Sequence, residues 1–529
     1  MPTYLTPGVY VEEIPAQSKP IEGVGTSIAA FVGLAPGGPV NTPMRISNWT
    51  QFARTFSDPA HPENGPFMEG AYLAHAVYGF FQNGGGLCWV VRVGAADGEA
   101  PARAQVALPA ATNPQIEAFR AVALEGVDGA ISLELTQEPG AKEEGGEGGE
   151  EKAAPDEGGT YRLVVTAAGQ TETHDGLSLK KGRNYIVTKV NAASKLIRLE
   201  ETGAALPESQ RAPATGSYTL VAAAQVPAEL APKEFEGDVA RRQGMGALAA
   251  VDEITMVCIP DAWTLAKNGD DVQVRDVQGK LIAHCEAMGD RMAILDAPPG
   301  MIAQDVLDWR MGAAGYDSKF ATLYYPWIEV MDPLTNRPTL IPPSGHVAGV
   351  WARTDGSRGV HKAPANEVVL GANGLAFQVT HEEQGGLNQR GINCIRAFPG
   401  RGIRIWGART LSSDPEWRYL NVRRLFNYVC ESIIEGTQWA VFEPNDERLW
   451  TRLRISTYNF LMRVWRDGAL FGATPEQAFF VKCDAETNPP DVIEAGQVVI
   501  ECGISPVKPA EFVVFRISQF TAGAAEVTA

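Results

Sequence analysis

Three apolar segments decide the fold class of this chain: residues 254–260 (ITMVCIP), 291–297 (RMAILDA) and 319–330 (KFATLYYPWIEV). The stretches between them, residues 272–288 and 303–311, are predicted to be helices. Strands that are apolar along their whole length are typical of a parallel sheet covered by helices on both faces. The alternation of strand and helix therefore predicts a multidomain protein of the α/β class, with a parallel sheet in its middle.

The same alternation begins earlier in the chain, in residues 21–99. An apolar strand is predicted within residues 25–35 (GTSIAAFVGLA), followed by an aromatic-rich helix over residues 68–81 and a buried strand over residues 87–93. We expect residues 21–99 to form the first part of the α/β domain and residues 245–374 to form its second part. The residues between these two parts then form an insertion.

Residues 100–244 are predicted to form this inserted, mostly β domain. Short segments rich in Val, Ile and Thr recur between turns, a pattern typical of strands; they cover residues 121–124, 131–136, 161–166, 184–190, 195–200 and 217–222. Residues 138–160 hold eight acidic residues and seven glycines, a composition that predicts a disordered loop. A metal site there is disfavoured because flexible glycines make a poor cage and the acids lack EF-hand spacing.

The last domain, residues 375–510, is predicted to be α+β. Helices are expected over residues 416–434, ended by Glu435-Gly436, and over residues 446–467. Strands are expected over residues 479–483 and 497–505.

Both ends of the chain are predicted to be extended arms. Residues 1–20 carry prolines at positions 2, 7, 15 and 20 around one short strand-like run, residues 8–14. Proline lacks an N–H group, so this segment suits an arm better than an interior strand, with a disordered tail as the alternative. Residues 511–529 are expected to be a C-terminal arm, a strand over residues 511–518 followed by a tail of small residues.

Composition excludes several classes of function. The net charge of −18 argues against a nucleic-acid partner, which needs a basic surface. Seven cysteines without a CxxC spacing argue against a metal cluster or disulfide framework and favour a reducing cytoplasm during folding. We expect no signal peptide and no membrane insertion, because no apolar stretch reaches the ~18–20 residues that span a bilayer. Release from the cell is then expected by lysis or inside a particle.

No complete catalytic, cofactor-binding or metal-binding motif is found, so no residue is assigned such a role. Asp261 and Asp296 fall at predicted strand ends, but no phosphate-binding loop accompanies them and both are read as polar residues that close strands. His346, Asp355 and His361 lie close in sequence, and hydrogen-bonding roles suit them as well as metal or acid–base chemistry. An α/β hydrolase or a nucleotide-dependent enzyme is therefore a disfavoured alternative.

Arginine is concentrated near the end of this acidic chain. Residues 388–470 contain thirteen arginines, no lysine and eight acidic residues, a local net charge of +5. Helical periodicity places a polar stripe along the helix predicted over residues 446–467, made of Arg448, Arg452, Asn459, Arg463 and Arg466. The adjoining apolar face is made of Leu449, Leu453, Phe460 and Val464. The stripe lacks the acids needed for (i, i+4) pairing, so we interpret it as a docking face for an acidic protein, with a solvated face as the alternative.

Four segments carry a resemblance to a known family. They are TPGVYVEEI (residues 6–14), FFQNGGGLCWVVRV (80–93), PPSGHVAGVWARTDGSRGVHKAPAN (342–366) and the block over residues 392–446 that begins INCIRAFPGRGIRIWGARTL. Together they resemble contractile tail sheath proteins of phages and of phage-derived contractile injection systems. Residues 100–240 do not match in detail, which fits the family's habit of carrying variable outer insertions.

The resemblance implies a structural sheath subunit and not an enzyme. Such a subunit polymerises as stacked six-fold rings around an inner tube and contracts to drive the tube through a target envelope, without a cofactor or nucleotide. The α+β domain is then innermost and the inserted domain points outward. The implied partners are other copies of the chain, the inner tube protein, and baseplate and tail-terminator or cap proteins.

The resemblance also implies roles for particular residues. The arms are expected to add strands to neighbouring copies through Val9, Tyr10, Val11 and Ile14 at the N-terminal end and Phe512, Val513, Val514, Phe515 and Ile517 at the C-terminal end. The stripe from Arg448 to Arg466 becomes the candidate contact with the tube, through weak ionic pairs that can release during contraction. Whether the particle is a phage, a bacteriocin or an injection system stays open.

Overall fold

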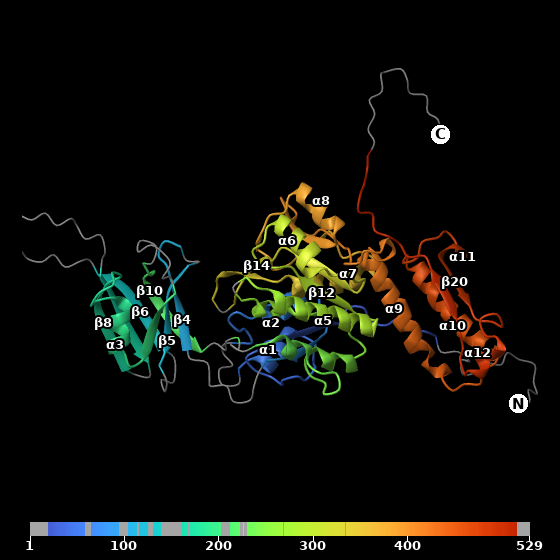
Figure 1. Ribbon diagram of the computed structural model, residues 1–529, viewed down its shortest axis with the longest axis horizontal. Coiled ribbons are helices and arrows are strands. Elements are labelled where there is room, and N and C mark those ends of the chain that lie inside the picture. The colour runs from blue at the N-terminus through green and yellow to red at the C-terminus, as the bar shows by residue number, and fades with distance from the viewer. Residues whose placement is uncertain are drawn as a thin grey trace, which may run out of the picture.

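The computed structural model describes residues 20–58, 65–94, 104–113, 116–124, 131–138, 160–167, 170–202, 212–222, 226, 230–267, 269–333 and 335–515. The predicted arm residues Val9, Tyr10, Val11, Ile14 and Ile517 lie outside these ranges, as does nearly all of the acidic loop over residues 138–160. The described residues form three units arranged in a row, with the inserted β unit at one end and the C-terminal unit at the other (Figure 1).

The central unit is built on a nine-stranded sheet with the order β16-β19-β18-β13-β12-β11-β1-β3-β2. In that order the strands are Glu367–Val368, Gly402–Ile405, Ile392–Phe398, Ala321–Tyr325, Met292–Asp296, Met256–Cys258, Ala29–Gly33, Cys88–Arg92 and Met44–Ile46. The six from β18 to β3 are parallel, and the strands outside them are antiparallel to their neighbours. Every residue of β1, β11, β12 and β13 is buried, as their unbroken apolar sequences predict.

Helices accompany this sheet: α1 (Trp49–Phe56), α2 (Leu73–Gln82), α4 (Pro232–Glu236), α5 (Val272–Met288), α6 (Ala303–Trp309), α7 (Ser344–Arg358) and α8 (His381–Gln389). The connection from β1 to β3 and the connection from β11 to β12 run in opposite directions along the sheet. Right-handed crossovers therefore place α2 and α5 on opposite faces. Helix α2 packs against α7 and β1, whereas α5 packs on β12. A small sheet of β15 (Pro338–Ile341), β14 (Ile328–Met331) and β17 (Gly374–Leu375) lies between β13 and β18 in sequence.

The central sheet continues past residue 374, where the sequence analysis places a domain boundary. Strand β18 pairs with β13 in parallel, with Leu323 opposite Ile392, and β19 then pairs with β18. This corrects the predicted start of the last domain at residue 375, because strands over 392–405 belong to the central unit. Sequence pattern could not show this, since parallel pairing joins strands that are far apart in the chain.

The inserted unit is a seven-stranded antiparallel sheet with the order β8-β7-β6-β10-β4-β5-β9. Its strands in chain order are β4 (Ala104–Pro109), β5 (Glu117–Ala123), β6 (Ile131–Glu138), β7 (Thr160–Ala167), β8 (Gln170–Leu177), β9 (Ile197–Glu201) and β10 (Gly216–Ala222). Its buried apolar residues form a cluster separate from that of the central unit. All seven strands lie within residues 100–244, the range predicted to form an inserted, mostly β domain.

One predicted strand of the inserted unit is wrong. Residues 184–190 belong largely to helix α3 (Ile186–Ala193). Ile186 and Val190 are one helical turn apart and both are buried, so the apolar residues fit a helical period as well as a strand. Asn191 fixes the end of this helix to β9, donating to the Leu199 carbonyl over 2.8 Å and accepting from the Leu199 N–H over 2.6 Å.

The C-terminal unit contains a long helical hairpin and a two-stranded sheet. Its elements are α9 (Leu420–Thr437), α10 (Glu447–Arg466), α11 (Pro475–Ala478), β20 (Phe479–Lys482), α12 (Pro490–Glu494) and β21 (Glu501–Ile504). Glu435-Gly436 does not end α9 as predicted, because the helix continues to Thr437. Gly436 instead lets another segment come close: a Cβ atom at Gly436 would lie 2.7 Å from Cγ2 of Ile21.

Candidate functional site

Helix α10, which carries the predicted docking face, is fixed at its start by Asp446. The Asp446 carboxylate accepts hydrogen bonds from the backbone N–H groups of Arg448 and Leu449, over 3.0 and 2.9 Å. This cap satisfies N–H groups that the first helical turn leaves free. The predicted apolar face is confirmed, because Leu449, Leu453, Phe460 and Val464 are all buried.

Arg452, in the predicted stripe, already has partners inside the chain. Its guanidinium carbon lies 4.3 Å from the centre of the Trp439 ring, and its Nη1 lies 3.7 Å from Oε2 of Glu443. Glu443 comes from the loop before α10, which a plot of the helix alone does not include. The side chain of Arg452 is half-buried in these contacts.

Arg463 is also engaged, although its side chain remains exposed. It donates a hydrogen bond to the backbone carbonyl of Ile21, a residue that is fully buried. This contact spans nearly the whole sequence, so sequence reasoning had no signal for it. Arg463 therefore attaches the N-terminal segment, at Ile21, to α10.

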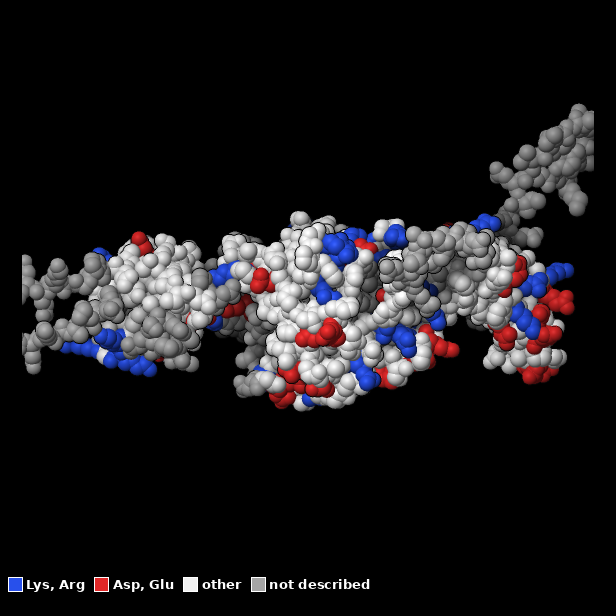
Figure 2. Space-filling view, turned by 90° about the horizontal axis from the view of Figure 1, so that it is seen from above, with Lys and Arg blue, Asp and Glu red and all other residues white. Residues whose placement is uncertain are grey.

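Three residues of the stripe remain available at the surface. Arg448, Asn459 and Arg466 are exposed, and their side chains make no hydrogen bond or ion pair within the described part of the chain. Ile455 lies on the same side by helical period and is also exposed. We call these four residues the α10 face. Where Figure 2 shows the C-terminal unit, basic and acidic side chains are intermixed, so the unit has no uniformly basic surface on that side.

The N-terminal segment enters the structure against the C-terminal unit. The N–H of Val24 donates to Oγ of Ser432 on α9 over 3.1 Å. Arg424 of α9 donates to the Thr26 carbonyl over 3.0 Å. Together with the buried Ile21, these contacts fix the start of the described chain on the C-terminal unit.

The C-terminal segment is held at a second fixed point by Arg409, whose backbone N–H donates to the Asn393 side chain on β18 of the central unit. Arg409 holds the Glu511 carboxylate by two parallel hydrogen bonds, the one from Nε to Oε1 being 2.9 Å long. Both side chains are largely buried in this ion pair. The four residues that follow, Phe512 to Phe515, are all exposed and form no strand. The strand predicted over residues 511–518 is thus absent from the described residues 511–515, which pair with no other strand.

The two-stranded sheet of β20 and β21 contributes Phe479 to the same buried cluster as Ile21. Phe479 pairs with Ile504 and Lys482 with Glu501 in antiparallel register, and no further described strand joins either edge. Phe479 is buried toward the hairpin, whereas Phe480 is exposed on the other face. Two-stranded sheets are marginally stable alone, and free strand edges invite pairing.

The strand-end carboxylates Asp261 and Asp296 hold the backbone. Asp261 accepts from the Leu34 N–H over 2.6 Å and from the Tyr72 N–H. Asp296 accepts from the Ser344 N–H over 2.8 Å, at the start of α7. Burial raises the pKa of each carboxyl to about 7, because desolvation outweighs these hydrogen bonds. Their role in the structure is to fix loops at the end of the parallel sheet.

His346, Asp355 and His361 do not converge on one site. His346 and Asp355 are nine residues apart on α7, roughly 13 Å along its axis. Burial lowers the pKa of His346 to about 3 and also lowers the pKa of the half-buried His361. Asp355 is paired with Arg424 of α9 at 2.5 Å, and both side chains are buried. This buried ion pair joins the central unit to the C-terminal unit, so the Asp355 carboxylate is not free to act as an acid or base.

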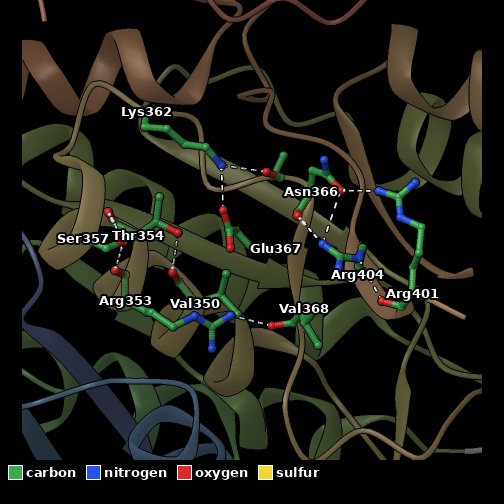
Figure 3. Close-up of polar contacts among 11 residues, drawn as sticks. Val350, Arg353, Thr354, Ser357, Lys362, Asn366, Glu367, Val368, Arg401 and Arg404 are labelled. Carbon is green, nitrogen blue, oxygen red and sulfur yellow. Dashed lines mark hydrogen bonds and ion pairs between the residues drawn. The ribbon is translucent and has the colours of Figure 1, made fainter. Parts of the chain in front are cut away.

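The polar residues after α7 hold the edge of the central sheet (Figure 3). Arg353 of α7 donates to the Val368 carbonyl over 2.5 Å, and Lys362 contacts Glu367 at 2.9 Å. Arg404 donates to the Asn366 carbonyl over 2.7 Å. These contacts fix the short edge strand β16. They give many of the polar residues after α7 a structural role.

Neither a metal site nor a membrane-spanning helix is found among the described residues. No group of three or more His, Cys, Asp and Glu side chains among them is arranged to hold a metal ion. None of the helices built from them is both long and apolar enough to cross a lipid bilayer.

Comparisons with known proteins match both the central and the C-terminal units. The family model described as phage tail sheath protein central domain matches residues 241–411, and that of the phage tail sheath C-terminal domain matches residues 412–520. The tail sheath protein of Burkholderia phage BcepMu is 26% identical over an alignment covering 95% of this chain and 94% of that protein. The tail sheath protein of Enterobacteria phage T4 is 22% identical, over 55% of this chain and 48% of that protein.

Solved structures share the fold over nearly the whole chain. The helical sheath of the anti-feeding prophage in its contracted state has a TM-score of 0.56 and 24% identity, covering 98% of this chain and 100% of that chain. The contracted sheath of an extracellular contractile injection system, PVC, has a TM-score of 0.56 and 22% identity, covering 98% and 99%. The boundary between the two family models, at residue 411, falls after β19 and agrees with the extent of the central sheet.

Proposed function

Because this chain belongs to the contractile tail sheath family, we propose that it polymerises as stacked six-fold rings around an inner tube and contracts to drive the tube through a target envelope. The family is structural, so the chain is a sheath component of a phage tail or contractile injection system and not an enzyme. The alternative of an α/β hydrolase or a nucleotide-dependent enzyme is thereby set aside.

One observation carries the proposal: the described chain is held at a fixed point near each of its ends, and the C-terminal unit contains a small sheet whose edges no other described strand joins. Ile21 is held by Arg463 of the C-terminal unit, and Glu511 is held by Arg409 of the central unit. The segment from Phe512 to Phe515 exposes four consecutive large apolar side chains. A monomer gains nothing from leaving such a segment in water, whereas a polymer can bury it.

In the proposed polymer, each arm adds a strand to a neighbouring copy. The open edges of β20 and β21 are the acceptors that the structure offers, and backbone hydrogen bonds supply the binding energy. The donor residues are Val9, Tyr10, Val11 and Ile14 in the N-terminal arm and Phe512, Val513, Val514, Phe515 and Ile517 in the C-terminal arm. Each copy is then both donor and acceptor, which links all copies into a continuous mesh.

The α10 face is proposed to touch the inner tube protein. Of the five residues predicted for this contact, Arg448, Asn459 and Arg466 are free to make it, whereas Arg452 and Arg463 already bind inside the chain. Exposed ionic contacts of ~0.2–1 kcal/mol each suit an attachment that must release. Repetition over many copies makes the total attachment strong.

The rest of the proposal concerns assembly and energy. We propose assembly in the bacterial cytoplasm with baseplate and tail-terminator or cap proteins, followed by release by lysis. Contraction needs no nucleotide, because the extended sheath is a metastable state that relaxes downhill once triggered.

Electron microscopy of the purified chain tests the proposal directly. We expect negatively stained samples to contain long tubes, formed without any added cofactor. Only small particles under every salt condition would count heavily against a sheath.

Deletion of the N-terminal arm tests the strand exchange. A chain lacking residues 1–20 keeps the contacts of Ile21, so we expect a folded monomer that forms no sheath. A matched control lacks residues 139–159, a deletion of similar length in the acidic loop, and should polymerise normally. Normal assembly of the first variant would sink the strand-exchange model.

A further inference from the structure

The loop that joins α9 to α10 presents an exposed apolar tip. Phe442 is fully exposed, and its neighbour Val441 is 63% exposed. Both lie at the turn of the helical hairpin, at the far end of the C-terminal unit from the central sheet (Figure 1). We call these two residues the hairpin tip.

Phe442 has an unusual backbone conformation. Its φ angle is +67°, in the left-handed region that disfavours residues with a Cβ atom. Among the other described non-glycine residues with positive φ, Asn41, Asn336 and Asn366 are of the type that tolerates it best. A bulky aromatic residue in this region is strained, and such strain marks functional loops when the surroundings hold it in place.

The surroundings of the hairpin tip do hold it in place. On either side of Phe442, the Val441 N–H donates to the Gln438 carbonyl and the Glu443 N–H to the Ala440 carbonyl, each over 3.2 Å. Arg452 contacts both Glu443 and Trp439, as described above. The loop therefore holds in a fixed position an aromatic ring that is fully exposed in the described part of the chain.

The same chain carries a pocket at the opposite end of the hairpin. It has a volume of about 340 Å³ and is lined by residues of the N-terminal segment, the connection after α7 and both hairpin helices. Its apolar lining comes from Val24, Val360, Leu425, Val464 and Ala469. Charged side chains complete the lining, among them Arg358 and Asp467. This volume is ample for a phenyl ring and an adjacent valine.

Phe442 cannot reach the pocket of its own chain. Helix α10 separates them: Asp446 caps its start, and Val464 lies in its last turn. The rise of an α-helix puts these two residues roughly 27 Å apart. Any insertion of the hairpin tip into such a pocket must therefore join two copies.

We propose that the hairpin tip of one copy inserts into this pocket of the next copy in the sheath. The proposal rests on the polymerisation proposed above and names one of its contacts. A knob and a pocket on different parts of one chain make a head-to-tail contact, which generates an open helical polymer when the rotation does not close. Val24 lines the pocket three residues after Ile21, so the insertion also contacts the segment from which the N-terminal arm departs.

Photo-crosslinking in assembled particles tests the contact. Phe442 is replaced by p-benzoylphenylalanine, the particles are irradiated, and crosslinked peptides are identified by mass spectrometry. We expect crosslinks between residue 442 of one copy and peptides of another copy that contain Val24, Val360 or Leu425. Crosslinks to the tube protein, crosslinks elsewhere on the sheath, or none at all would overturn the proposal.

Matched variants separate this contact from a general loss of apolar surface. Phe442→Ala should raise the protein concentration needed for polymerisation by on the order of tenfold. Phe471→Ala removes a ring that is 71% exposed elsewhere in the C-terminal unit and should change it little. Equal effects of the two variants would contradict the proposal.

Two more variants keep the test independent of folding. Phe442→Gly removes the ring and the unfavourable φ together, so its monomer should unfold at no lower denaturant concentration than the parent while polymerising as poorly as Phe442→Ala. Val24→Trp places a larger side chain in the pocket lining and should give the same defect with an intact tip. If the parent chain forms tubes and these variants do so equally well, the tip contact fails and the sheath function stands. Failure of the parent chain itself would instead refute the sheath function.

Discussion

At the scale of single residues, a buried ion pair ties three parts of the chain together. Arg424 on α9 binds the Asp355 carboxylate on α7 with two hydrogen bonds of 2.9 and 2.5 Å. The guanidinium also lies 4.7 Å from the centre of the Trp351 ring and donates to the Thr26 carbonyl. The central unit, the helical hairpin and the N-terminal segment therefore share one charged group.

Breaking this pair should be strongly destabilising. We expect Asp355→Ala to lower the free energy of unfolding by about 3–5 kcal/mol, because Arg424 is left buried without a counter-charge. Urea denaturation followed by tryptophan fluorescence measures the change. Glu443→Ala is the control: it breaks the more exposed pair with Arg452 and should cost no more than ~1 kcal/mol. A similar loss in both variants would contradict the assigned role of Asp355.

The buried carboxyl of Asp296 predicts a pH dependence. Its pKa rises from 3.8 to about 7 on folding, so between these values the folded chain keeps a proton that the unfolded chain loses. Stability therefore falls as pH rises from about 4 to about 7. We therefore compare the free energy of unfolding of Asp296→Asn with that of the parent at each pH. This difference should shift in favour of the variant by about 3 kcal/mol between pH 5 and pH 8. It retains an oxygen that can accept from the Ser344 N–H.

Asp317→Asn is the opposite control for this measurement. Hydrogen bonds from Ser413 lower the pKa of Asp317, so its contribution to stability is present above the ordinary pKa and is lost as pH falls. Relative to the parent, this variant should therefore become less stable as pH rises from below the folded pKa to about 5. The same pH trend for both variants would mean that another group controls the profile.

At the scale of elements, the C-terminal segment from Phe512 to Phe515 and the α10 face are both left without partners in the described chain. The segment is an extended apolar strand candidate, and the face is a mixed row of cations and uncharged side chains. The two features require different partners. The segment needs backbone hydrogen bonds, whereas the α10 face needs side chains of opposite charge.

Proline substitution tests whether the C-terminal arm pairs through its backbone. Val513→Pro and Val514→Pro each remove one N–H, and neighbouring residues of a strand point their N–H groups to opposite sides. We expect one of the two to lower sheath yield in negative-stain micrographs more than Val513→Ala and Val514→Ala do. If all four variants assemble alike, strand addition by these residues is wrong.

Charge reversal tests the α10 face. Arg448→Glu and Arg466→Glu should weaken assembly on tubes more than tube-free polymerisation, because they remove attraction to an acidic tube protein. The comparison is made by sedimentation with and without purified tubes. Equal effects on both processes would assign the α10 face to sheath–sheath contacts.

At the scale of the whole molecule, the chain is a row of units with separate cores. The inserted β unit has its own buried cluster and touches the central unit through polar contacts such as Arg120 with Glu69, 3.4 Å apart and partly exposed. A pair of this kind contributes little to stability. The central and C-terminal units, in contrast, share buried contacts through α7 and α9.

Removing the inserted unit should leave the rest folded. We expect replacement of residues 96–224 by a short Gly/Ser linker to shift the melting temperature of the remaining chain by no more than a few degrees. Scanning calorimetry of the two proteins measures this. Loss of the cooperative transition would show that the central core depends on the insertion.

The sequence by itself determined the local and periodic features of this protein. Unbroken apolar runs gave the buried parallel strands, and helical periodicity gave the bounds of α5 and the apolar face of α10. Family segments identified the sheath. Tertiary structure decided which distant parts meet: β18 beside β13, Ile21 against Gly436, and Glu443 and Ile21 as partners for two arginines of the predicted stripe. These contacts depend on how the chain folds back on itself. The hydrophobic periodicity of a sequence describes single helices and strands and does not show which distant segments come into contact.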